Sequence, residues 1–166
     1  MKNEPSVSSV HPELWALLVE EMIDEASAQE VEAARKIMES YFAGQPRLER
    51  KQMSNLVAVA GETVTVPIVE DFVRYQMGRD TGCQTWNAGS PKSLGKSILD
   101  HLKELKTRAT ALVERARKRS PDKLPAGADE SEINRVWCML CRRFVAYLEH
   151  SFLYYKSEKG QRGGER

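Results

Sequence analysis

The chain has 166 residues, of which 41% are hydrophobic and 30% are charged, and its net charge is +1. This length and composition predict one domain with a hydrophobic core and exclude a chain that is disordered throughout. No apolar stretch approaches the roughly 18 residues that a membrane span needs, and the first residues carry no secretory signal. The three cysteines have no framework spacing and are typical of reduced thiols. The sequence therefore predicts a soluble cytoplasmic protein without a membrane partner.

The N-terminal part is expected to form an acidic helical arm over residues 11–45. Residues 1–10 are polar and are predicted to be disordered. His11-Pro12-Glu13 begins a first helix, because proline followed by an acidic residue suits a first turn. Apolar side chains at helical spacing predict a second helix over residues 29–42, and Gly44-Gln45-Pro46 ends it.

Two shorter helices are predicted next. The third helix covers residues 47–60, with Gly61 as its C-terminal cap. Residues 64–66 are rich in β-branched side chains, which favour a strand. However, Pro67 and the helical spacing after it predict a turn into a fourth helix, which ends before a loop over residues 80–92.

Two long helices complete the chain. One is predicted over residues 93–119, where the apolar residues keep to one narrow stripe. A linker rich in proline and glycine over residues 121–127 leads to the last helix, which begins near Asp129 with acidic residues in its first turn. The far side of this helix is also apolar, at Met139, Ala146 and Leu153. Residues 158–166 are predicted to be a flexible tail.

Together these elements predict an all-α fold, a helical bundle of about five core helices with an extra helical N-terminal arm. A single domain is expected over residues 11–157, made of the arm (11–45) and a core (46–157). The apolar far side of the last helix exceeds what a monomer needs and predicts a second packing surface.

Charge is divided unevenly along the chain. Residues 1–46 hold three basic and nine acidic side chains, a net charge of −6, and residues 47–166 hold 22 basic and 15 acidic ones, a net charge of +7. An acidic arm on a basic body predicts one face for a protein neighbour and another for phosphate.

No catalytic or metal-binding motif stands out. Cys138 and Cys141 form a single CxxC inside a helix, and no second pair completes a zinc site. Asp100 and His101 are adjacent on a helix, where neighbouring side chains point about 100° apart and form no dyad. Neither GxxxxGK[ST] nor GxSxG occurs. We therefore predict a protein that is not an enzyme and needs no cofactor or metal.

Basic side chains on rigid helices are the candidates for a functional surface. Lysine and arginine dominate the polar face of the helix over residues 93–119. Arg135 and Arg142 are one heptad apart on the last helix, and Arg74 and Arg79 flank Tyr75-Gln76. Arginine forks match phosphate oxygens, so this pattern favours contact with a nucleic-acid backbone. The alternative is that these side chains form a solvated face and nothing more.

Three segments resemble the small subunit of type III-A CRISPR effector complexes, the Csm complex. Arg50-Lys51-Gln52-Met53-Ser54-Asn55-Leu56 is similar to that family's "SQLRNL" or "SKLRNL" helix, and Phe72 to Arg79 is similar to its "FVYQAGR" helix. Arg142-Arg143-Phe144-Val145-Ala146-Tyr147-Leu148, followed by Phe152, Tyr154 and Tyr155, resembles its aromatic C-terminal helix. The resemblance covers roughly residues 46–157 in order. The family's arginine before Asn55 is Ser54 here, and its Thr-Thr-Ser entry is Glu49-Arg50-Lys51, so the basic role is expected at Arg50 or Lys51.

The resemblance implies a five-helix core that stacks in several copies along the backbone subunits of the complex. It would contact the crRNA–target RNA duplex through charge, while the backbone and large subunits cut RNA and DNA. Recognition would then use phosphates and shape, and base pairing would supply the sequence specificity. The predicted phosphate contacts are Arg50, Lys51, Arg74, Arg79, Arg135 and Arg142.

Two other functions are open on the sequence alone. The first is a helical protein–protein adaptor that does not bind nucleic acid, in which the acidic arm and the apolar far face dock proteins. The second is a small hydrolase that uses His101 or the cysteines. RNA binding that depends on salt separates the first alternative from the RNA-contacting subunit, and loss of an activity on mutation would be needed to support the second.

Overall fold

The computed structural model describes residues 12–44, 47–119 and 129–163. Five helices occur in this part of the chain: α1 Pro12–Phe42, α2 Arg50–Glu62, α3 Val66–Arg79, α4 Leu94–Arg119 and α5 Asp129–Gly163. These residues contain no strand, so the predicted all-α helical bundle is confirmed. The predictions for residues 1–10 and 121–127 lie outside the described residues.

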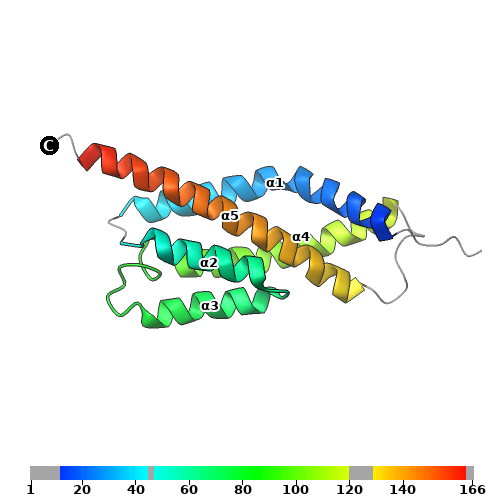
Figure 1. The fold of residues 1–166 in the computed structure, drawn as a ribbon, viewed down its shortest axis with the longest axis horizontal. Coiled ribbons are helices and arrows are strands. Elements are labelled where there is room, and N and C mark those ends of the chain that lie inside the picture. The colour runs from blue at the N-terminus through cyan, green and yellow to red at the C-terminus, as the bar shows by residue number, and fades with distance from the viewer. Residues whose placement is uncertain (1–11, 45–46, 120–128, 164–166) are drawn as a thin grey trace, which may run out of the picture.

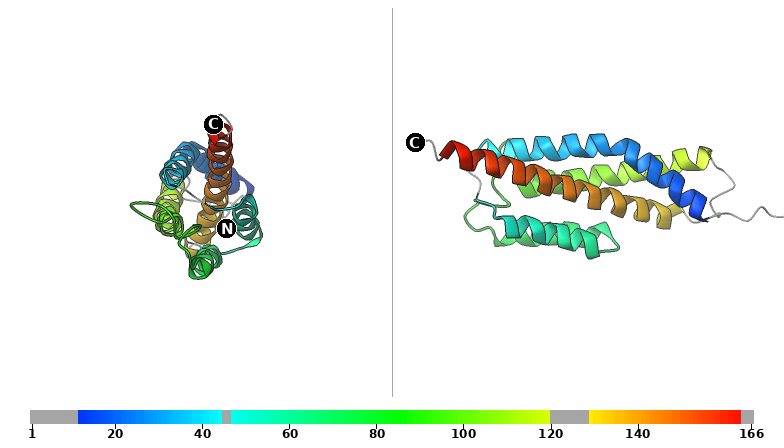
Figure 2. Two further views of the ribbon diagram at one scale, coloured as in Figure 1. Left: turned by 90° about the vertical axis from the view of Figure 1, so that its left-hand side faces the viewer. Right: turned by 45° about the horizontal axis from the view of Figure 1, so that its top comes forward.

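The three long helices α1, α4 and α5 run side by side, and the shorter α2 and α3 pack along one side of them (Figure 1). Figure 2 shows α5 between α1 and α4 on one side and α2 on the other. Contacts join α5 to each of the other four helices. Met139 and Leu153, on the far side of α5, are partly buried against the core, while Arg135 and Arg142, about one turn before and after Met139, are exposed. The bundle therefore covers this side of α5 only in part, and the second packing surface stays a prediction.

The predicted N-terminal arm is an integral part of the bundle. The segment expected as two helices is the single helix α1, because no glycine or proline interrupts residues 24–30 and Ser27 Oγ donates a hydrogen bond to the Ile23 carbonyl at 3.0 Å. Met22, Ile23 and Met38 are fully buried. Helix α1 packs on both α4 and α5, so removing it would expose the core.

Helices α2 and α3 form a short antiparallel pair. Glu49 and Gln52 make a capping box at the start of α2. Gly61 was predicted to cap α2, but the helix continues to Glu62 and Thr63 is its C-cap. The predicted turn into the next helix is confirmed, since α3 begins at Val66 with Pro67 in its first turn.

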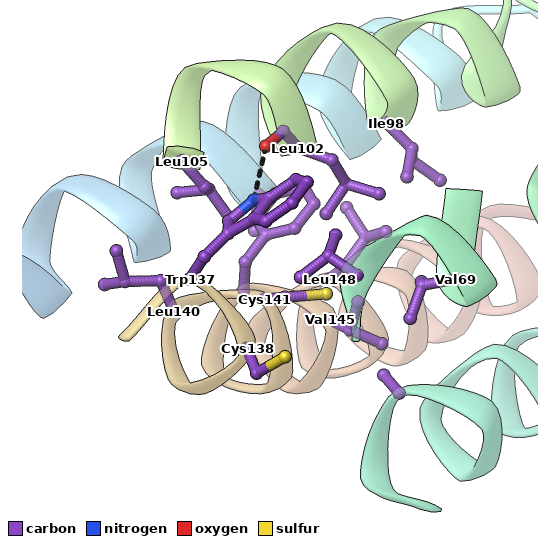
Figure 3. Packing of buried hydrophobic residues seen from close by; sticks show 14 of the residues in the cluster. Val69, Ile98, Leu102, Leu105, Trp137, Cys138, Leu140, Cys141, Val145 and Leu148 are labelled. Atoms are coloured by element: carbon purple, nitrogen blue, oxygen red, sulfur yellow. Dashed lines mark hydrogen bonds between the residues drawn. The ribbon is translucent and has the colours of Figure 1, made fainter. Parts of the chain in front are cut away.

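The core lies where α4 and α5 face each other. Trp137 Nε1 donates a hydrogen bond to the Leu102 carbonyl at 2.8 Å, which satisfies the one polar atom of this buried ring (Figure 3). Ile98, Leu102 and Leu140 are fully buried around it. The narrow apolar stripe predicted for α4 is thus the face that meets α5.

The C-terminal end differs from the prediction. The tail predicted over residues 158–166 is helical as far as Gly163, because α5 continues to that residue. Residues 164–166 lie outside the described part of the chain. None of the helices in the described part is both long enough and apolar enough to cross a membrane.

Candidate nucleic-acid interface

One end of the α2–α3 pair is joined to the loop over residues 80–92. The Arg47 backbone N–H donates a hydrogen bond to the Gln84 carbonyl at 3.0 Å, and Arg47 Nη1 donates to Gln84 Oε1 at 2.9 Å. The first turn of α2, the last turn of α3 and this loop therefore lie at the same end of the molecule (Figure 1).

Asp80 holds the loop in shape. Its carboxylate accepts hydrogen bonds from the backbone N–H groups of Gln84 (3.1 Å), Thr85 (3.0 Å) and Asn87 (2.8 Å). Partial burial acts to raise the pKa of the Asp80 carboxyl, but these hydrogen bonds outweigh it and hold that pKa below its ordinary value. Gly89 has a φ of +116°, which a residue with a side chain rarely adopts. The loop therefore has a defined conformation that its own hydrogen bonds stabilise.

A hollow of about 540 Å³ lies between α2, α3 and this loop. We call it the α2–α3 hollow. Its lining is mostly polar and consists of Gln52, Asn55, Gln76, Arg79, Asp80, Thr81, Gly82, Gln84, Thr85 and Trp86. It brings together side chains from both helical motifs on which the family resemblance depends.

Three of the predicted phosphate contacts lie at this end. Arg79 lines the hollow; its Nη1 donates a long hydrogen bond to the Tyr75 hydroxyl at 3.5 Å, and its guanidinium lies 5.4 Å from the centre of the Tyr75 ring. Arg50 and Lys51 are exposed in the first turn of α2 and have no hydrogen-bond or ion-pair partner among the described residues. Cations without an intramolecular partner are the ones available to an external phosphate.

The other three predicted contacts lie elsewhere and have partners. Arg74 forms an ion pair with Glu70 at 3.5 Å, and Arg135 Nη2 donates to Glu132 Oε1 at 2.6 Å. Arg142 donates to the carbonyl of Ala60 at 3.2 Å and to that of Thr63 at 2.8 Å. These carbonyls end α2, so Arg142 acts as a side-chain cap on that helix.

Arg135 and Arg142 line a second groove of about 720 Å³ together with Val64, Ser131, Asn134, Cys138 and Met139. This groove lies at the other end of α2, beside the turn into α3. The structure therefore does not gather the six predicted residues into one surface. The α2–α3 hollow is the better candidate for phosphate, because Arg50, Lys51 and Arg79 form no ion pair with a carboxylate among the described residues.

Part of the acidic charge of the N-terminal segment is neutralised by ion pairs with basic side chains of the same chain. Acidic residues of α1 pair with basic residues of α4 and α5: Asp24 with Arg143, Glu25 with Arg115 at 3.3 Å, and Glu30 with Arg108. The acidic N-terminal part thus covers a portion of the basic body. The acidic face predicted for a protein neighbour and the basic face predicted for phosphate are smaller by the side chains that form these pairs.

The buried titratable groups have structural partners. Glu30 is fully buried, and its Oε2 lies 2.7 Å from His101 Nε2. Burial raises the pKa of the Cys141 thiol to about 12 and holds that of the Cys138 thiol above its ordinary value, so neither is disposed to act as a thiolate. The described residues contain no group of three or more His, Cys, Asp or Glu side chains placed to hold a metal.

Sequence reasoning missed several lining residues of the hollow. Gln52, Asn55 and Gln76 stand inside the motifs, but their uncharged side chains gave no electrostatic signal. Trp86 lies in a loop that the motifs do not cover.

Comparisons with models of known protein families, with curated proteins and with solved structures found no match.

Proposed function

We propose that this chain is a non-catalytic small subunit of a type III CRISPR RNA-guided interference complex, with a role in antiviral defence. It contacts the crRNA–target RNA duplex through the phosphate backbone, stacks with further copies of itself, and packs against the backbone and large subunits. Base pairing between the two RNAs supplies sequence specificity, and this chain supplies charge and shape.

The observation that carries the proposal is the α2–α3 hollow. The two helical motifs are about 20 residues apart in sequence, yet Gln52 and Asn55 of the first and Gln76 and Arg79 of the second line one hollow. Arg50 and Lys51 add cations at the same end. A fold that brings two separate motifs to one basic, polar surface is what a shared RNA-contacting role requires.

The adaptor function keeps one observation in its favour. Val64, Ile68 and Tyr75 are large apolar side chains exposed along α3 and the turn before it, with Val64 81% exposed. An exposed apolar stripe of this kind is typical of a protein-docking surface. Such a surface also suits the subunit contacts of the proposed assembly, so the two functions differ in RNA binding.

Fluorescence anisotropy with labelled RNA separates the two functions. We expect the intact chain to bind an RNA duplex, with an affinity that falls by at least about tenfold between 50 and 200 mM salt, because each phosphate contact releases counterions. The affinity should be the same for duplexes of unrelated sequence. Absence of binding at 50 mM salt would contradict the RNA-contacting function and favour the adaptor.

A further inference from the structure

Two carboxamides in the α2–α3 hollow have no partner inside the protein. Of the four amide side chains that line it, Gln52 accepts a hydrogen bond from the Glu49 backbone N–H at 2.9 Å and Gln84 accepts one from Arg47. The side chains of Asn55 on α2 and Gln76 on α3 have no hydrogen-bond partner among the described residues. The hollow therefore offers two donor–acceptor groups from two different helices.

A buried donor in the lining also lacks an acceptor. Trp86 is 1% exposed, and its Nε1 is the only fully buried side-chain polar atom without a hydrogen-bond partner in the described part of the chain. A buried N–H without an acceptor is costly, and an ordered water is a common partner for such a group. Because this atom is fully buried, the carboxamides and cations of the hollow alone select its ligand.

The chemistry of the lining selects the ligand class. A phosphate only accepts hydrogen bonds, so it would use Arg79, Arg50 and Lys51 but not the oxygens of the carboxamides. A nucleobase edge both donates and accepts, and asparagine and glutamine are side chains that pair with such edges. The volume of about 540 Å³ lies within the range of ordinary small-ligand sites. Base edge and phosphate together describe a nucleotide.

An unpaired nucleotide fits this lining better than a paired one. In an A-form duplex the Watson–Crick edges are occupied, the deep major groove admits no side chain and the shallow minor groove offers only part of each base edge, whereas an unpaired base exposes all its edges for hydrogen bonding. We infer that the α2–α3 hollow binds a single unpaired nucleotide of RNA, with Asn55 and Gln76 contacting the base and Arg79 contacting its phosphate. This inference rests on the RNA-contacting function proposed above and names the site and the RNA feature that it recognises.

The test compares two labelled RNA duplexes that differ by one unpaired nucleotide. A perfect duplex and the same duplex with a single-nucleotide bulge are titrated with the intact chain at 50 mM salt, with each of the four bases in turn at the bulge. We expect the bulged duplex to bind about tenfold more tightly for at least one base, the scale of one good pair of side-chain hydrogen bonds to a base. In N55A/Q76A this preference should fall to within about twofold while the affinity for the perfect duplex stays the same.

A matched control removes the same two types of side chain at positions outside the hollow. Q29A/N134A deletes one glutamine and one asparagine side chain outside the hollow, on α1 and α5. It should keep the preference for the bulge. Because the side chains of Asn55 and Gln76 make no hydrogen bond with the described residues, N55A/Q76A should unfold at the same temperature as the unmodified chain, which circular dichroism verifies.

The outcomes separate this inference from the proposed function. Equal affinity of the unmodified chain for the bulged and perfect duplexes, with strong salt dependence, would overturn the nucleotide site and leave backbone contact intact. A preference that survives in N55A/Q76A would come from the flexibility of the bulged duplex and would also overturn the site. No binding to either duplex would overturn both.

Discussion

Glu30→Ala is expected to lower the free energy of unfolding by about 3 kcal/mol, because it leaves the buried His101 ring and the partly buried Arg108 guanidinium without their carboxylate partner. The Glu30 carboxylate is fully buried between α1 and α4, where it meets His101 and the Arg108 guanidinium. His101 is itself 6% exposed, and its ring packs against that of Phe144 with centroids 4.3 Å apart. The variant therefore weakens the core contact between α1, α4 and α5.

Urea unfolding followed by circular dichroism measures this effect. The matched control is Glu32→Ala, which removes a glutamate on the same helix whose partners Arg35 and Lys36 are exposed. Exposed ion pairs contribute little to stability, so Glu32→Ala should change the midpoint little. If the two variants were equally stable, the buried pair would not hold α1 to the bundle.

The variant R50A/K51A/R79A is expected to weaken binding to an RNA duplex about 100-fold at 100 mM salt and to reduce the slope of log K against log salt by about 2 to 3 units. The three side chains lie at the end of the molecule that carries the α2–α3 hollow. Because each is argued to contact a phosphate and not a base, the loss should be the same for all duplex sequences.

A second triple variant controls for net charge. K103A/K118A/R119A also removes three positive charges, from exposed positions on α4 that form no ion pair with the described residues. Its affinity should fall much less, since only the long-range field is reduced. Equal losses in the two variants would mean that the protein binds RNA through its overall charge and not at this end.

The sequence predicts helices well where the periodicity is long and uninterrupted. The stripe of α4 is the face that meets α5, and the turn before α3 was found because Pro67 outweighs the β-branched residues that precede it. Two predictions were wrong: the separate helix expected to begin at residue 29 and the cap expected at Gly61. Both depended on local residue types alone, whereas α1 is continuous through residue 29 and α2 continues to Glu62.

Packing around α5 explains the other differences. Periodicity showed that α5 is apolar on more than one side but could not say that α5 contacts all four of the other helices. Net charge likewise does not show which charges meet. Asp24, Glu25 and Glu30 are far in sequence from Arg143, Arg115 and Arg108, and only the fold brings them together.

The candidate site was predictable in part. Motif resemblance and charge pointed to Arg50, Lys51 and Arg79, which lie together, and equally to Arg74, Arg135 and Arg142, which bind carboxylates or backbone carbonyls of the fold. Whether a cation is free depends on neighbours distant in sequence, so composition and spacing could not separate the two sets. That Trp86 Nε1 is buried without a partner is likewise visible only in the folded structure.

The position of bound RNA tests the central claim most directly. The intact chain is cross-linked at 50 mM salt to an RNA duplex carrying 4-thiouridine, and the cross-linked residues are identified by mass spectrometry. The account predicts cross-links on residues 47–55 and 75–86, which form the end of the molecule around the α2–α3 hollow. Cross-links confined to α4, or to the groove beside Arg135 and Arg142, would contradict it.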